Sequence, residues 1–310
     1  MTSLRSIVAA TYLASLPVVS HAQIEITLKN SFIENYKDRT TIEATYTVDK
    51  AHRTPNPPAK DGDMHIAGRA PQIGLATVAE IVNAASESAA VALVHSVEGT
   101  GDTVHITGAW RIWCEHAGIV AQVQGKKLAP FTTTNPPHVF EIHPITQVGA
   151  NTVLDSWVPI DGYTPKEAGA AFLNYENRKS QITVNATRNT TTITTTMAGY
   201  NYVEFKMVLN GEQQEVADGR FVMAQVLDLQ NELLVHNRRM VFVKGTAPEQ
   251  KVQTLQAGDT LHVLGIPRID LALVSYRVRN RATRPDALTW SLPYEILVVA
   301  VYSDTASPSR

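Results

Sequence analysis

The chain has 310 residues, 44% of them hydrophobic, and a formal net charge of −2 at pH 7. Basic doublets such as Lys126-Lys127 and Arg238-Arg239 are isolated in the sequence. A protein that neutralises phosphates normally carries a basic face. We therefore expect no nucleic-acid partner. The single cysteine, Cys114, excludes an intrachain disulfide, and its apolar neighbours favour a buried thiol over a reactive nucleophile.

Residues 1–22 have the pattern of a secretory signal peptide. Arg5 precedes an apolar run, residues 7–19, that is too short to span a bilayer comfortably, and small residues occupy the two cleavage-site positions before Gln23. The alternative is a buried N-terminal strand. The pattern predicts an exported protein, secreted or periplasmic, with no membrane span after cleavage.

The segment after the signal peptide alternates β-branched and polar residues in the manner of half-buried strands. Three prolines within residues 51–58 exclude a strand interior there. The Ala-rich stretch 84–97 lacks glycine and proline, which favours a helix. The predicted elements of this first unit are strands at 41–48, 63–67 and 77–82, a helix at 84–97, and strands at 103–113 and 138–148.

A linker and a second unit follow. Within the linker, Thr164 to Glu167 fits a capping box with proline at the first helical position, which predicts a helix from Pro165 to about Asn177. The Thr-rich stretch 181–196 predicts a hairpin. The remaining predicted elements are strands at 202–208, 220–227 and 240–243, a helix at 248–256, and strands at 261–269 and 294–301.

The two units are copies of each other. The segment 101–112, GDTVHITGAWRI, recurs at 258–269 as GDTLHVLGIPRI, with seven of twelve positions identical. Asp61-Gly62 recurs as Asp218-Gly219 at the same separation. A register kept over this distance indicates a duplicated structural unit. The predicted organisation is a signal peptide at 1–22, a first barrel at 23–150, a linker with a helix at 151–180, and a second barrel at 181–310.

The element order of three strands, a helix and two strands, over about 40–148 and 200–302, resembles the OB-fold. This resemblance implies two five-stranded Greek-key barrels in tandem, joined by a short helix, in a mainly β chain. It also implies a ligand surface on strands two and three, flanked in the first unit by the long loops 51–62 and 117–137. The chain further resembles uncharacterised secreted bacterial proteins that carry Asp-Gly-Asp-x-His followed by Glu-Ile-His-Pro, a likeness that implies no particular activity.

Most candidate site residues are side chains that only the first copy carries, because residues kept in both copies serve the scaffold; Glu141 is the exception, since the second copy keeps it as Glu295. Asp63 and His65 correspond to Arg220 and Val222 in the second copy, and His143 has no histidine counterpart. Strand periodicity places Asp63 with His65, and Glu141 with His143, on shared faces. The acidic and histidine candidates at the presumed barrel rim are Asp63, His65, Glu115, His116, Glu141 and His143.

Two interpretations of these side chains remain open. They can hydrogen-bond a ligand or one another, or they can bind Zn²⁺ or another first-row divalent ion. The metal candidates are Asp63, His65, His116, Glu141 and His143.

Trp110 and Trp113 complete the candidate ligand-binding set. Their spacing of three in a strand predicts one indole in the core and one that faces outward or makes a loop contact, and an exposed indole could stack on a sugar or an aromatic ligand.

The sequence assigns no catalytic residue and requires no cofactor apart from a possible divalent metal. We expect an exported, non-catalytic binding or scaffold protein whose first barrel takes a small molecule, a sugar or a protein. The alternative is a divalent-metal-dependent hydrolase that uses the Asp/Glu/His cluster of the first barrel.

Overall fold

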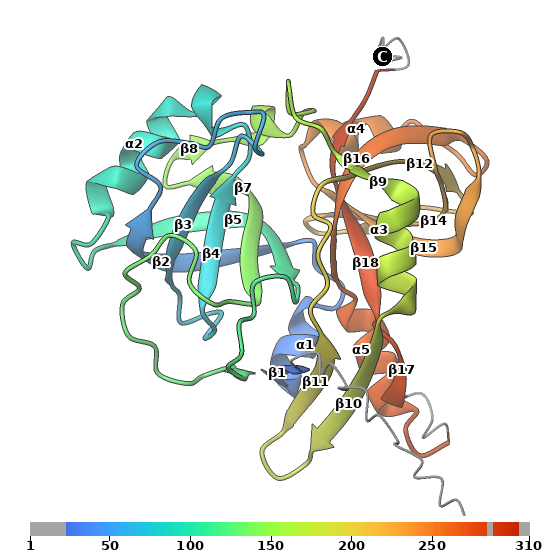
Figure 1. Ribbon diagram of the computed structural model, residues 1–310, viewed down its shortest axis with the longest axis horizontal. Coiled ribbons are helices and arrows are strands. Elements are labelled where there is room, and N and C mark those ends of the chain that lie inside the picture. The colour runs from blue at the N-terminus through green and yellow to red at the C-terminus, as the bar shows by residue number, and fades with distance from the viewer. Residues whose placement is uncertain (1–22, 284–287, 304–310) are drawn as a thin grey trace, which may run out of the picture.

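The computed structural model describes residues 23–283 and 288–303 (Figure 1). The predicted signal peptide lies outside the described residues. The described fold is mainly β, as predicted, with two closed five-stranded barrels and the helix α3 (Ala168–Asn177) between them in the chain. No helix within these two ranges is long and apolar enough to cross a membrane.

The first barrel is closed by a parallel pair of strands. Neighbouring strands pair antiparallel in the order β4-β3-β2-β5-β7, and β4 then pairs parallel with β7. The helix α2 (Ser88–Val97) packs against β2 and β7. The barrel strands are β2 (Thr41–Ala51), β3 (Met64–Arg69), β4 (Thr77–Ile81), β5 (Thr103–Ile112) and β7 (Phe140–Val148), and β8 (Asn151–Thr152) pairs with the end of β7.

The second barrel repeats this order. Its strands run β15-β14-β12-β16-β18, and the parallel pairing of β15 with β18 closes it. The short helix α4 (Ala247–Val252) precedes the fourth strand, as α2 does in the first barrel. The strands are β12 (Val203–Leu209), β14 (Gly219–Leu227), β15 (Leu233–Val243), β16 (Thr260–Ile269) and β18 (Tyr294–Val301), and β13 (Gln214–Val216) pairs with β14. The predicted internal repeat is therefore confirmed.

The two barrels match down to a glycine in the fourth strand. Gly108 in β5 and Gly265 in β16 each lie at a register shift against the last strand of their barrel. A Cβ atom at either position would come within 2.6 Å of an isoleucine Cγ2, that of Ile142 or that of Ile296. Both copies therefore need glycine here for close approach of the strands.

A third sheet connects the start of the chain to its second half. The strand β1 (Gln23–Lys29), which the sequence did not predict, pairs antiparallel with β11 (Thr190–Thr196). The predicted hairpin is formed by β11 and β10 (Lys179–Asn185). The sheet is completed by β17 (Thr289–Ser291) beside β10 and β6 (Gln122–Val123) beside β1.

Two helices absent from the predicted elements, α1 (Asn30–Tyr36) and α5 (Leu271–Arg279), pack against each other beneath the barrels (Figure 1). The N-terminal segment is therefore attached to the second half of the chain as well as to the first barrel.

The predicted capping box of α3 is wrong, although the helix exists. Residues Lys166–Glu167 form the short strand β9, which pairs with β12, so the helix begins only at Ala168. Glu167 is the N-cap residue, and its carboxylate accepts hydrogen bonds from the backbone N–H groups of Gly169 and Ala170.

The barrels contact each other through matched arginines. Arg111 donates from Nε to the carbonyl oxygen of Pro267 (2.8 Å), and Arg268 donates from Nη1 to that of Trp110 (2.9 Å). Arg111 corresponds to Arg268 in the repeat, and Trp110 to Pro267. Because both guanidinium groups are buried, this reciprocal contact lies inside the protein, between the two barrels.

Candidate functional site

Most of the predicted site residues gather where the first barrel meets the second. Asp63 directly precedes β3, Arg111 lies near the end of β5 opposite Glu141, and Glu141 and His143 alternate along β7. His143 Nδ1 lies 3.2 Å from a carboxylate oxygen of Glu141, so these two side chains share a face, as strand periodicity predicts.

Glu141 is held by three partners. Its carboxylate forms an ion pair with Arg111 and lies 3.3 Å from His138 Nε2, in addition to the His143 contact. Burial by itself would raise the pKa of this carboxyl, but the charge of Arg111 and the two imidazole contacts hold the pKa well below its usual range. Glu141 is therefore ionised, and its charge is neutralised within the protein.

The other side of His143 faces a tyrosine from the second barrel. Tyr202, which directly precedes β12, donates its hydroxyl to Asp63 (2.6 Å), and the same oxygen lies 2.7 Å from His143 Nε2. Asp63 also lies 3.4 Å from that nitrogen. A single phenol thus joins an acid and an imidazole of one barrel to the other barrel.

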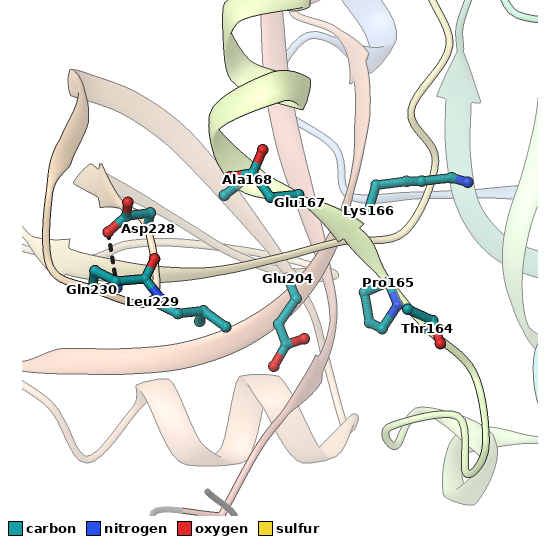
Figure 2. A pocket seen from close by; sticks show the side chains of 9 residues that line it. All are labelled: Thr164, Pro165, Lys166, Glu167, Ala168, Glu204, Asp228, Leu229 and Gln230. Carbon is teal, nitrogen blue, oxygen red and sulfur yellow. Dashed lines mark hydrogen bonds between the residues drawn. The ribbon is translucent and has the colours of Figure 1, made fainter. Parts of the chain in front are cut away.

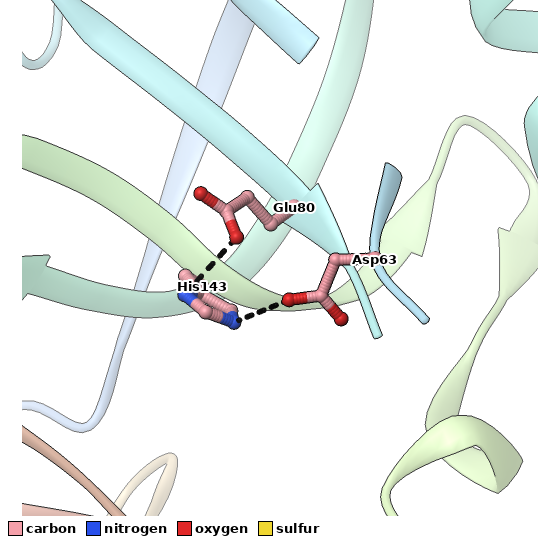
Figure 3. A group of neighbouring side chains, drawn as sticks. All are labelled: Asp63, Glu80 and His143. Carbon is pink, nitrogen blue, oxygen red and sulfur yellow. Dashed lines mark ion pairs between the residues drawn. The ribbon is translucent and has the colours of Figure 1, made fainter. Parts of the chain in front are cut away.

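Glu80 is a member of the cluster that the sequence analysis missed. It lies in β4 opposite His65, and one carboxylate oxygen is 3.4 Å from His143 Nδ1 and 3.6 Å from His65 Nε2. Figure 3 shows His143 between Glu80 and Asp63. A charged residue in the otherwise apolar strand TVAEI was the available signal for Glu80.

Burial and the neighbouring charges shift the pKa values of Glu80, Asp63 and His143. Burial raises the pKa of Glu80 well above its usual value and also raises that of Asp63, because the charged carboxylate loses its hydration. Burial would lower the pKa of His143, but the surrounding carboxylates of Glu80, Asp63 and Glu141 raise it well above 6.5. The surrounding carboxylates therefore favour the protonated form of this imidazole.

His65, Glu115 and His116 lie closer to solvent than the rest. The ring of His65 stacks on that of His52 with centroids 4.5 Å apart, and burial lowers the pKa of His65 to about 3. His116 stacks on His138 at 5.2 Å, and Glu115 lies 3.5 Å from Arg111 Nη2. These three residues surround the buried group and do not enter it.

Trp110 and Trp113 are both buried, so neither indole faces outward, and Trp113 lies in the loop that follows β5. Trp110 donates from Nε1 to the Arg39 carbonyl (2.7 Å), and the guanidinium of Arg268 lies 3.6 Å above its ring. Trp113 packs edge-on against Tyr175 at 5.6 Å. Trp110 therefore stabilises the contact between barrels, and neither indole offers a free stacking surface.

The second barrel keeps only part of this arrangement. Arg268 and Glu295 form a buried ion pair at 2.7 Å, as Arg111 and Glu141 do in the first barrel. Where the first barrel has Asp63, the second has Arg220, which pairs with Glu249 at 2.9 Å. The Arg–Glu pair therefore belongs to the scaffold, whereas the Asp63–His143 arrangement is confined to the first barrel.

A pocket on the second barrel contains three carboxylates, but all are engaged (Figure 2). Glu167 caps α3, Glu204 lies 2.8 Å from His262 Nε2, and Asp228 accepts from the backbone N–H groups that follow it. This pocket is explained by local structure and offers no free acid to a ligand.

A groove on the first barrel has a different character. It lies between the start of β4 and the long loop after β5, and its lining residues are Leu75, Ala76, Val120, Ala121, Gln122, Val123, Lys126, Lys127, Leu128, Ala129, Phe131 and Pro137. Val120 in its lining is 58% exposed, and Ile119, which precedes it in the chain, is 89% exposed. Exposed apolar side chains beside two lysines are a typical feature of a ligand surface.

No protein-family model matches the chain, and the comparison with curated protein sequences finds no match.

Proposed function

We propose that the protein is an exported, non-catalytic binding or scaffold protein in which two OB-like Greek-key barrels act as one body and the first barrel takes the ligand. Export to the periplasm or the exterior rests on the pattern of residues 1–22. The binding role rests on the groove and the exposed side chains of Ile119 and Val120, and this is the observation that carries the proposal.

Asp63, Glu141 and His143 are buried at the contact between the barrels, so they are not exposed to a ligand at the surface. Glu141 is paired with Arg111, and His143 and Asp63 share the hydroxyl of Tyr202 from the second barrel. The contacts of Tyr202 with Asp63 and His143 stabilise the contact between the barrels. We therefore propose the groove beside the loop after β5, in place of the predicted polar rim, as the ligand site.

The chemistry of the groove favours a small ligand with an apolar part and a negative charge. Leu128 and Phe131 offer apolar contacts, and Lys126 and Lys127 lie at the same groove. Pro130 and Pro136 restrict the loop, which reduces the entropy lost when the loop orders around a ligand. Sugar and protein ligands are the other outcomes that a binding screen can return.

The fluorescent probe 1-anilinonaphthalene-8-sulfonate combines an aromatic surface with a sulfonate and tests this groove. We expect saturable binding to the folded protein and about tenfold weaker binding to Val120→Asp, because a carboxylate repels the sulfonate and is poorly accommodated beside Phe131. The matched control is Leu233→Asp, at an exposed leucine of the second barrel. Absence of saturable binding, or equal weakening by the control, contradicts the proposal.

The alternative function is a divalent-metal-dependent hydrolase, favoured by one observation. Donor atoms of Asp63, Glu80 and His143 lie within 4.8 Å of one another, and an ion held there could activate water. Hydrolysis of chromogenic phosphate and carboxylate esters with added Mn²⁺ or Zn²⁺ tests it. Activity that His143→Asn abolishes would replace the binding proposal with this one.

A further inference from the structure

The buried group of Asp63, Glu80 and His143 has the composition of a metal site. The three residues come from the start of β3, from β4 and from β7, and one donor atom of each lies within 4.8 Å of the others (Figure 3). Their exposed fractions are 1%, 4% and 0%. Carboxylate oxygens with an imidazole nitrogen are a common donor set for first-row divalent ions.

The balance of charges in this group favours a cation. Arg111 is committed to Glu141 and Glu115, and among the described residues neither Asp63 nor Glu80 forms an ion pair with any lysine or arginine. Two buried carboxyls therefore share the imidazole of His143, and Glu80 has in addition a contact of 3.6 Å with His65. Carboxylates removed from water need compensation by a cation, a proton or hydrogen bonds.

One oxygen of Asp63 also lacks a partner. Its Oδ2 accepts from Tyr202, but its Oδ1 is buried and forms no hydrogen bond with any of the described residues. Orphaned acceptors of this kind are rare in protein interiors. Figure 3 shows this oxygen pointing away from His143, so an ion here would be held through Oδ2 and the unmet hydrogen bond of Oδ1 is a separate feature of Asp63.

The second barrel provides an internal comparison. It folds in the same strand order with Arg220 and Leu297 where the first barrel has Asp63 and His143. The fold therefore does not require an acid and an imidazole at these positions, and their presence in the first barrel needs a separate reason.

We propose that Asp63, Glu80 and His143 bind one structural Zn²⁺ or Mn²⁺ ion at the contact between the barrels. Nε2 of His143 faces Asp63, and its Nδ1 faces Glu80, at 3.4 Å each. Nε2 provides the imidazole donor, where the ion replaces the 2.7 Å contact of this nitrogen with the Tyr202 hydroxyl. Nδ1 of His143 keeps the 3.2 Å contact with Glu141, the arrangement in which a carboxylate orients a histidine ligand. Tyr202 retains its hydrogen bond to Asp63, so the ion lies at the contact between the barrels. This inference does not depend on the proposed ligand groove.

Calorimetric titration of the full chain, without a histidine tag and after treatment with EDTA, tests the site. We expect one Zn²⁺ or Mn²⁺ ion per chain and a loss of at least about 100-fold in affinity for Glu80→Gln. This variant retains shape and removes the donor charge. The matched control is Glu204→Gln, because Glu204 forms the Glu–His pair of the second barrel with His262, and it should bind within about threefold of the wild type.

Folding of each variant is checked by circular dichroism and thermal melting. At 100-fold excess over Kd the ion should raise the Tm of the wild type by roughly 5 °C, and this rise should be absent in Asp63→Asn even if Glu80→Gln does not fold. A folded wild-type protein that binds neither ion, or binding that survives both substitutions, overturns the proposal.

Discussion

Removal of one hydroxyl at the contact between the barrels should destabilise the whole protein. In Tyr202→Phe, Asp63 loses a hydrogen bond of 2.6 Å and His143 loses a contact of 2.7 Å. The remaining contact between the acid and the imidazole is 3.4 Å long. A hydrogen bond to a charged group contributes about 1.5–3 kcal/mol. Because both partners are buried and receive no replacement from water, we expect the free energy of unfolding to fall by about 2–4 kcal/mol.

The assay is urea unfolding at pH 7 in EDTA, followed by tryptophan fluorescence. The midpoint should fall while the m-value stays unchanged, because the native surface is the same. Tyr163→Phe is the matched control, since its ring lies 5.7 Å from that of Tyr202 and its hydroxyl has no hydrogen-bond partner within the described ranges. A loss below about 0.5 kcal/mol, or a loss equal to that of the control, would refute the role assigned to Tyr202.

Three further outcomes follow from the scaffold and from the half-buried histidine. Gly108→Ala and Gly265→Ala should each lower the free energy of unfolding in urea by about 1–3 kcal/mol, because the new Cβ atom meets an isoleucine at 2.6 Å. The control is Gly211→Ala, where the new Cβ atom meets nothing within 4 Å. A similar loss of stability in the control would contradict the argument. Arg268→Met should cost about 3–5 kcal/mol, because the buried Glu295 loses its 2.7 Å ion pair and keeps only a 3.5 Å contact with Arg239. An unchanged denaturation midpoint would disprove it. Burial lowers the pKa of His65 to about 3, so the unfolded chain binds more protons below pH 6.5 and the stability from this group is lost as pH falls from 6.5 toward 3. Between pH 7 and pH 4 the wild type should therefore lose at least about 1 kcal/mol more than His65→Gln, and parallel pH profiles would exclude this effect.

The two-barrel architecture could be predicted because the sequence of one structural unit occurs twice in the chain. The matched segments at 101–112 and 258–269 form β5 and β16, and their shared glycines occupy equivalent register shifts. The start of α3 could not be predicted, because residues 166–167 pair with β12. A capping pattern in the sequence contains no information about such a distant strand.

The candidate site could be predicted in part. Strand periodicity brought Glu141 and His143 together, and the difference between the copies identified Asp63. Burial of these residues was not predicted, because the surface that covers them belongs to the second barrel. Tyr202 precedes a strand far along the chain, and only the docking of the barrels brings it to Asp63.

Differential scanning calorimetry of the full chain tests most directly whether the buried contacts unite the two barrels. Arg111 and Arg268 each donate to the opposite barrel, and Tyr202 binds Asp63 across the same boundary. Unfolding of one barrel would leave these groups unpaired, so we predict a single transition with equal calorimetric and van't Hoff enthalpies. Two resolved transitions, or a calorimetric enthalpy about twice the van't Hoff value, would show that the barrels unfold independently and would contradict this account.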